Sequence, residues 1–209
     1  MNWGELKAAA IEYINRGDVT ASLLTTMLPL VEQRIYNGTE FAGRKVPGLR
    51  LMSMLTTVSN QAAGALPSNF ISAYRVSRMT GTRPTPLEYR GPIAFARLEG
   101  LGTPADIFTI RGGELVLGGT GTSTVELLYF ARPTRPVADS DTNVVMSSND
   151  AVYLYGLLWE VSNWLRDSER VSQYAALFID AMLSATSTDE QRSTDGGALV
   201  ITSDMRVRV

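Results

Sequence analysis

The chain has 209 residues, of which 44% are hydrophobic and 19% charged, and its 19 basic residues nearly balance 21 acidic ones. This near-neutral charge argues against a general nucleic-acid binder, whose affinity depends on many basic contacts to phosphates. Cysteine and histidine are absent, so the sequence excludes a thiolate nucleophile, a Cys/His zinc site and hydrolysis by a Ser-His-Asp or Cys-His set.

Two helices are expected at the N-terminus. Apolar spacing predicts the first over residues 2–16, with Gly17 as a left-handed cap. It predicts the second from Ala21 to Tyr36, stopped by Asn37-Gly38. Because Pro29 lies inside the second helix, we expect a kink there or two abutting pieces.

No segment is typical of a signal peptide or a membrane span. Glu5 and Lys7 interrupt the apolar pattern of the N-terminus. No apolar run approaches the roughly 18 residues that cross a bilayer. We therefore expect a soluble protein made in a cytosol.

Residues 38–50 are predicted to form a loop punctuated by glycine and proline. The loop carries Arg44, Lys45 and Arg50, which could contact phosphate or an acidic partner. A solvated loop without such a contact is the simpler interpretation of three basic residues.

Short strands are expected in the middle of the chain, where helical periodicity fades. Residues 65–70 read as a turn entering a short helical piece, and Gly112-Gly113 is a two-residue hairpin signal. The expected strands are 54–59, 73–79, 87–90, 107–111, 114–118 and 124–131, with one helical turn over 92–98. A small antiparallel β-region inserted between helices makes the class α+β.

The glycine-rich run Gly118–Thr122 is not typical of a phosphate-binding loop. It lacks a following lysine, and a strand follows it, whereas phosphate loops open helices. We predict a hairpin turn there.

A helical hairpin is expected after a polar loop of residues 133–149. Apolar residues recur at helical spacing in two segments that meet at the charged corner Arg166–Arg170. The hairpin holds two of the three tryptophans, and aromatic side chains bury large areas, so we expect the main packing unit here. Its apolar surface is wider than a small monomer needs, which raises the question of a partner.

The C-terminal end changes character twice. After Ala185 the sequence is polar and predicts a linker. From Ala198 it becomes β-prone, and apolar residues alternate with Asp204, Arg206 and Arg208. The last segment is either an edge strand of the protein's own β-region or a strand added to another subunit.

Only carboxylates, lysine, tyrosine and serine are available for catalysis. A glycosidase needs two carboxylates at a fixed separation beside a cleft, and the sequence does not pair the acidic residues of the β-region. A hydrolase of cell-wall sugar that uses Glu88 and Glu126 is therefore kept only as an alternative hypothesis. We predict a protein that is not an enzyme, with no catalytic residue, no metal site and no cofactor.

Six segments occur in an order and at a spacing typical of one family. Together they resemble the head-to-tail adaptor, or head completion, proteins of tailed bacteriophages, especially those with short tails. The resemblance covers roughly residues 1–185. The segments are Leu66–Phe70, Pro86–Tyr89, Phe108–Leu117, Glu126–Pro133, Asp150–Trp159 and Leu165–Arg170.

The resemblance implies a structural virion protein. It implies an α-helical bundle with an inserted β-region and an extended C-terminal arm, assembled as a dodecameric ring under the portal. The ring would bind the portal and its own neighbours, extend the DNA channel without sequence-specific contact to DNA, and carry the tail or nozzle. Its place would be the virion neck, with synthesis in the bacterial host cytoplasm and no membrane contact. Another ring, such as a tail-tube connector or stopper, is the alternative.

The resemblance also divides the chain and suggests its contact residues. The divisions are N-terminal helices 1–53, β-region 54–132, helical hairpin 133–187, and linker with arm 188–209. The arm would place its apolar residues in portal grooves and its arginines on acidic portal rims; its residues are Leu199, Val200, Ile201, Met205, Arg206, Val207, Arg208 and Val209. The hairpin would form the wall between subunits through Tyr155, Trp159, Trp164, Tyr174 and Phe178.

Overall fold

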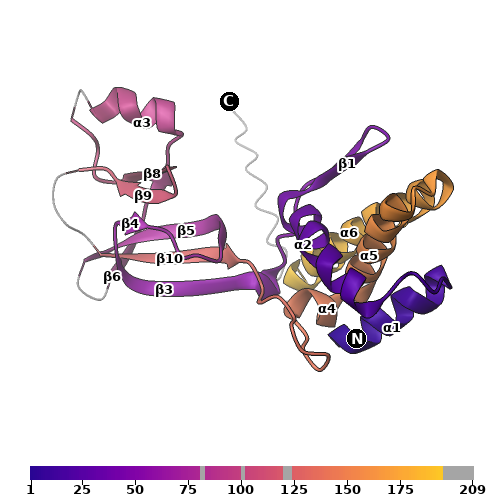
Figure 1. Ribbon diagram of the computed structural model, residues 1–209. Helices are drawn as coiled ribbons and strands as arrows, with labels where there is room; N and C mark the ends of the chain where they lie inside the picture. Colours follow the sequence, from indigo (N-terminus) through magenta and orange to yellow (C-terminus); the bar gives the residue numbers. More distant parts are fainter. Residues whose placement is uncertain (81–82, 100–101, 120–123, 195–209) are drawn as a thin grey trace, which may run out of the picture. The chain divides into compact units, whose positions relative to one another are not determined.

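The computed structural model describes residues 1–80, 83–99, 102–119 and 124–194 (Figure 1). The chain divides into two compact units. Among the described residues, the helical unit combines Met1–Met52 with residues 136–194, and the β-unit is Ser53–Arg135. Helices dominate the first unit and strands the second, which confirms the predicted α+β class.

Helix α5 is the centre of the helical unit. It contacts α1, α2, α4 and α6, and its most extensive contact is with α6. Gly156 of α5 lets α2 approach closely, because a Cβ atom at this position would lie 2.5 Å from Cγ1 of Val31. The helices are α1 (Trp3–Ile14), α2 (Ala21–Asn37), α4 (Val144–Ser148), α5 (Asp150–Leu165) and α6 (Ser168–Thr194).

The first two helices follow the prediction except at their ends. The side chain of Asn2 caps α1, and Glu5 completes the capping box. The left-handed cap of α1 is Asn15, at φ 51°, and the prediction of Gly17 was wrong. Asparagine tolerates this conformation because its short polar side chain can bond locally. Helix α2 runs through Pro29 as one helix, so the abutting pieces are not found.

A small hairpin replaces most of the loop predicted over residues 38–50. Strand β1 (Thr39–Phe41) pairs antiparallel with β2 (Arg44–Val46). Both turn residues have positive φ, 49° at Ala42 and 77° at Gly43, as a type I′ turn requires. Alanine is unusual in such a turn, so no hairpin was predicted at this position.

The segment before α4 holds the start of α1. The backbone N–H of Trp3 donates to the carbonyl of Asp141 at 2.9 Å, and that of Gly4 donates to the carbonyl of Asp139 at 2.8 Å. The Asp141 carboxylate in turn accepts the N–H groups of Val137 and Ala138, both at 2.9 Å. These two bonds lower the pKa of Asp141, because they stabilise its charged form.

We expect Asp141→Asn to reduce the stability of the helical unit at pH 6, and we expect this difference between the two proteins to shrink as the pH falls below about 3.9. A carboxyl whose pKa is lowered by folding stabilises the fold above its unfolded pKa, about 3.9, and loses that contribution as pH falls through the folded value. Thermal melts of both proteins across this pH range provide the measurement. Two parallel stability curves would contradict the assignment.

Helix α6 is longer than expected. Residues 186–194, which we predicted to belong to a polar linker, continue the helix, and that prediction was wrong. The carboxylate of Asp189 accepts the backbone N–H of Met52 at 2.7 Å, and the hydroxyl of Thr186 donates to the carbonyl of Met182 at 3.1 Å. Extending a helix costs little once its first turns are packed, which explains how a polar sequence stays helical.

The β-unit consists of two four-stranded sheets, in the orders β3-β10-β5-β6 and β4-β9-β8-β7. Its core contains Val76, Phe108, Leu115, Val125, Leu127 and Tyr129. All pairings are antiparallel except β7 with β8, which is parallel. The strands are β3 (Leu55–Ala62), β4 (Gly64–Ala65), β5 (Phe70–Thr80), β6 (Arg83–Pro86), β7 (Glu88–Tyr89), β8 (Ile107–Arg111), β9 (Glu114–Leu117) and β10 (Thr124–Ala131).

Two turns of the β-unit were predicted from glycine residues, and only one of them is found. Gly112-Gly113 joins β8 to β9 as predicted, with Arg111 opposite Glu114. The predicted hairpin at Gly118–Thr122 was wrong, because β9 and β10 belong to different sheets. Phe70 begins β5, so the helical piece expected there was also wrong. Helix α3 (Pro92–Glu99) confirms the helical turn predicted over 92–98.

Candidate functional site

The hairpin of α5 and α6 turns at a tight corner. Arg166 adopts the left-handed conformation at φ 59°, and the N–H of Asp167 donates to the carbonyl of Ser162 at 3.1 Å. The Asp167 carboxylate accepts the N–H of Arg170 at 3.1 Å and so caps the start of α6. Arg170 also donates to the carbonyl of Ile14 at 3.2 Å, which ties the corner to α1.

Trp159 is the aromatic centre of the hairpin. Its ring centroid lies 5.7 Å from that of Phe41 on β1 and 5.6 Å from that of Phe178 on α6. The guanidinium carbon of Arg34 lies 3.9 Å from the centroid of the same ring. A cation over an indole face is attracted by the negative face of the ring. Trp159 therefore joins α2, α5, α6 and β1 in one cluster.

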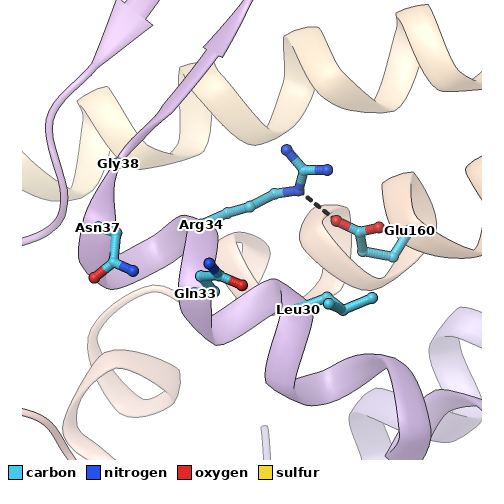
Figure 2. A pocket seen from close by; sticks show the side chains of 6 residues that line it. All are labelled: Leu30, Gln33, Arg34, Asn37, Gly38 and Glu160. Atoms are coloured by element: carbon cyan, nitrogen blue, oxygen red, sulfur yellow. Dashed lines mark hydrogen bonds and ion pairs between the residues drawn. The ribbon is translucent and has the colours of Figure 1, made fainter.

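Figure 2 shows Arg34 reaching from α2 to Glu160 on α5, at one side of a small cleft. The Nε atom of Arg34 donates to the Glu160 carboxylate, and Nη1 lies 3.5 Å from the hydroxyl of Thr39. Glu160 is buried, whereas about a third of the Arg34 side chain stays exposed. The cleft has a volume of about 400 Å³ and is lined by Leu30, Gln33, Arg34, Asn37, Gly38 and Glu160.

We expect Glu160→Ala to lower the free energy of unfolding of the helical unit by about 1–3 kcal/mol. The change leaves a partly buried guanidinium without its charged partner, and partial exposure of Arg34 limits the loss. Urea unfolding followed by tryptophan fluorescence measures it, since all three tryptophans lie in the helical unit. Asp180→Ala, which breaks the exposed pair with Arg44 in the same unit, is the control and should cost less than about 1 kcal/mol. Equal losses would contradict the role of the buried carboxylate.

Arg34 and Glu160 were not identified from the sequence. Both lie on amphipathic helices, where charged residues usually face solvent. The available signal was the position of Glu160, which directly follows Trp159 inside an apolar run of α5. A carboxylate in such a run needs a cation close by, but the sequence does not say that α2 supplies it.

The five hairpin residues have different environments. Trp159, Tyr174 and Phe178 are buried within the chain, and Tyr155 is half-buried. Trp164 is 48% exposed and lies in the last turn of α5, next to the corner. Within the hairpin, Trp164 therefore offers the largest aromatic surface to a neighbour, whereas the buried three stabilise the subunit itself.

The three basic residues of the predicted contact loop do not form one cationic patch. Arg44 pairs with Asp180 of α6 at 2.8 Å. Arg50 is half-buried, donates to the carbonyls of Tyr36 and Leu49, and has a pKa lowered by burial. Lys45 is exposed. Two of the three thus fix the loop to its own unit, and phosphate contact stays a prediction.

Glu88 and Glu126, the two carboxylates of the alternative hydrolase, each pair with an arginine. Glu88 pairs with Arg90 at 2.9 Å, and Glu126 pairs with Arg75 at 3.0 Å. The arm, Leu199–Val209, lies outside the described residues. Across the described ranges, no group of acidic side chains is arranged to hold a metal ion, and no helix is long and apolar enough to cross a bilayer.

A model of the SU10 adaptor protein family matches residues 1–202. The chain belongs to this family. The match confirms the resemblance to phage head-to-tail adaptors that the six ordered segments indicated. This SU10 adaptor is thus a structural protein of phage assembly. A search of curated proteins gave no match.

Proposed function

We propose that this SU10 adaptor forms a ring, dodecameric like the portal, that binds the portal, extends the DNA channel and attaches the tail or nozzle. The observation that carries the proposal is the family match over residues 1–202, which spans both units. The near-neutral charge of the chain suits a channel through which DNA slides without being held.

The helical hairpin supplies the wall between neighbouring subunits in this proposal. A ring needs contacts between two different faces of each subunit. Trp164 at the corner and Leu183 on α6, 48% and 45% exposed, are large apolar side chains available for such contacts. Tyr155, which is half-buried, adds a further aromatic surface on α5, the helix that carries Trp164. The buried Trp159 and Phe178 pack inside the hairpin and keep it rigid.

The C-terminal arm supplies the contact to the portal. Its residues follow α6, which ends at Thr194 in the helical unit. Apolar residues at 199–201, and those alternating with Arg206 and Arg208, fit grooves with acidic rims. An arm that orders only on docking suits sequential assembly, since binding then pays the cost of ordering.

Sedimentation of the adaptor with purified portal rings tests this function. We expect the adaptor to co-sediment with the portal at one adaptor chain per portal chain. An adaptor that forms rings alone, ignores the portal and binds purified tail proteins would instead be a connector or stopper. An adaptor that binds neither would contradict the proposal.

A further inference from the structure

The β-unit has an open groove between its two sheets. The groove has a volume of about 730 Å³ and is lined by the first residues of β5 together with residues of β7 and β8. Tyr74 and Tyr89 stand at its rim, 57% and 55% exposed. Phe108, a member of the core, lies 5.5 Å from Tyr89, ring centroid to ring centroid. The groove thus leads from solvent directly to the core of the β-unit.

One wall of the groove is the edge of a strand. Strand β6 pairs with β5 only over Ser77–Thr80, and the N–H of Leu87 then donates to the carbonyl of Val76 at 2.9 Å. Beyond that point the chain leaves β5 and pairs with β8 as β7. Among the described strands, none continues the sheet on this side of the N-terminal part of β5. Such an edge is a template for an added strand.

The backbone of β5 directs two side chains here. In the pairing of β5 with β10, Tyr74 and Ile71 have no partner residue on β10. Each is therefore the extra residue of a β-bulge in β5. Bulges of this kind re-aim side chains and often lie at sheet edges. Both extra residues line the groove.

The groove suits an uncharged apolar segment. Glu88 is the one carboxylate in its lining, and Arg90 neutralises it at 2.9 Å. The chain itself contains such a segment in the part that follows α6. Residues 198–202, Ala-Leu-Val-Ile-Thr, carry no charge and consist mostly of β-formers. An apolar β-prone run of this kind readily joins strand edges when it has no partner.

We propose that the groove beside β5 accepts residues 198–202 of a second copy of this chain as an added strand. Main-chain hydrogen bonds to the open edge of β5 would give affinity, and alternate aliphatic side chains would fill the groove. The inference concerns the protein before it meets a portal, and it does not rest on portal binding. A portal that takes the same arm would compete with this contact.

A labelled peptide of residues 196–209 tests the groove. The protein that receives the peptide, here called the acceptor, is the full-length chain carrying Val200→Asp. This substitution puts a charge into the acceptor's own residues 198–202 and makes them unsuited to an apolar groove. We expect the peptide to bind, and an added Ile71→Lys to weaken binding about tenfold or more. Ile93→Lys is the matched control, because Ile93 is 76% exposed on α3 outside the groove, and it should change nothing.

A second probe avoids any change of the β-unit. A peptide that itself carries Val200→Asp should bind the same acceptor about tenfold or more weakly than the natural peptide. Sedimentation should show that Val200→Asp reduces self-association of the full-length protein. No peptide binding, equal binding by the Ile71→Lys and Ile93→Lys acceptors, or unchanged self-association would each overturn the proposal.

Discussion

Replacing Trp159 with alanine is expected to lower the free energy of unfolding of the helical unit by about 3–5 kcal/mol. The side chain is 3% exposed and contacts two aromatic rings and the guanidinium of Arg34. Its loss opens a cavity where four elements meet. Tryptophan-to-alanine changes in a packed core reach this range because the cavity adds to the lost transfer free energy.

The control is the same substitution five residues further along α5. Trp164→Ala removes a side chain that is 48% exposed, so the subunit should lose less than about 1 kcal/mol. If the corner forms the wall between subunits, the same change should weaken ring formation at unchanged subunit stability. Urea unfolding gives the stabilities, and sedimentation gives the assembly. Equal destabilisation by both substitutions would contradict the division between a buried and an exposed tryptophan.

Deleting residues 196–209 is expected to weaken portal binding about 100-fold or more and to leave the subunit folded. Each fully buried aliphatic side chain contributes about 1.5–3 kcal/mol to binding. Losing several docked side chains therefore removes more binding free energy than a 100-fold change in affinity requires. The deletion starts after the last described turn of α6, which keeps the contact between Asp189 and Met52.

A binding titration of portal rings with both proteins measures the effect of the deletion. Circular dichroism and thermal melts should be the same for the full and shortened chains. Unchanged affinity of the shortened chain would show that the arm is not the portal contact. A point control, Asp204→Ala, removes no apolar or basic side chain of the arm and should bind as the natural chain does.

Local sequence patterns correctly predicted the elements whose structure depends mainly on their own residues. The spacing of apolar residues placed α1, α2 and α5, and Gly112-Gly113 placed the turn between β8 and β9. Patterns failed where distant contacts decide. The polar end of α6 is held by the bond from Met52 to Asp189, and β10 pairs with β3 and β5 and not with β9, its predecessor in the chain.

The candidate site was predictable in part for the same reason. The aromatic content of the hairpin indicated its importance, but helical spacing does not tell which ring faces solvent. Burial separates Trp159 from Trp164, and the ion pair of Arg34 with Glu160 joins residues far apart in the chain. The basic loop also looked like one patch in the sequence, whereas Asp180 and two carbonyl groups engage two of its three cations.

Electron microscopy of the adaptor mixed with its purified portal tests the central proposal most directly. We expect an added ring of density on the portal, coaxial with the channel and with the portal's own rotational symmetry. This ring should be lost for the chain without residues 196–209. Portal particles without added density at saturating adaptor, or adaptor bound away from the channel axis, would contradict it.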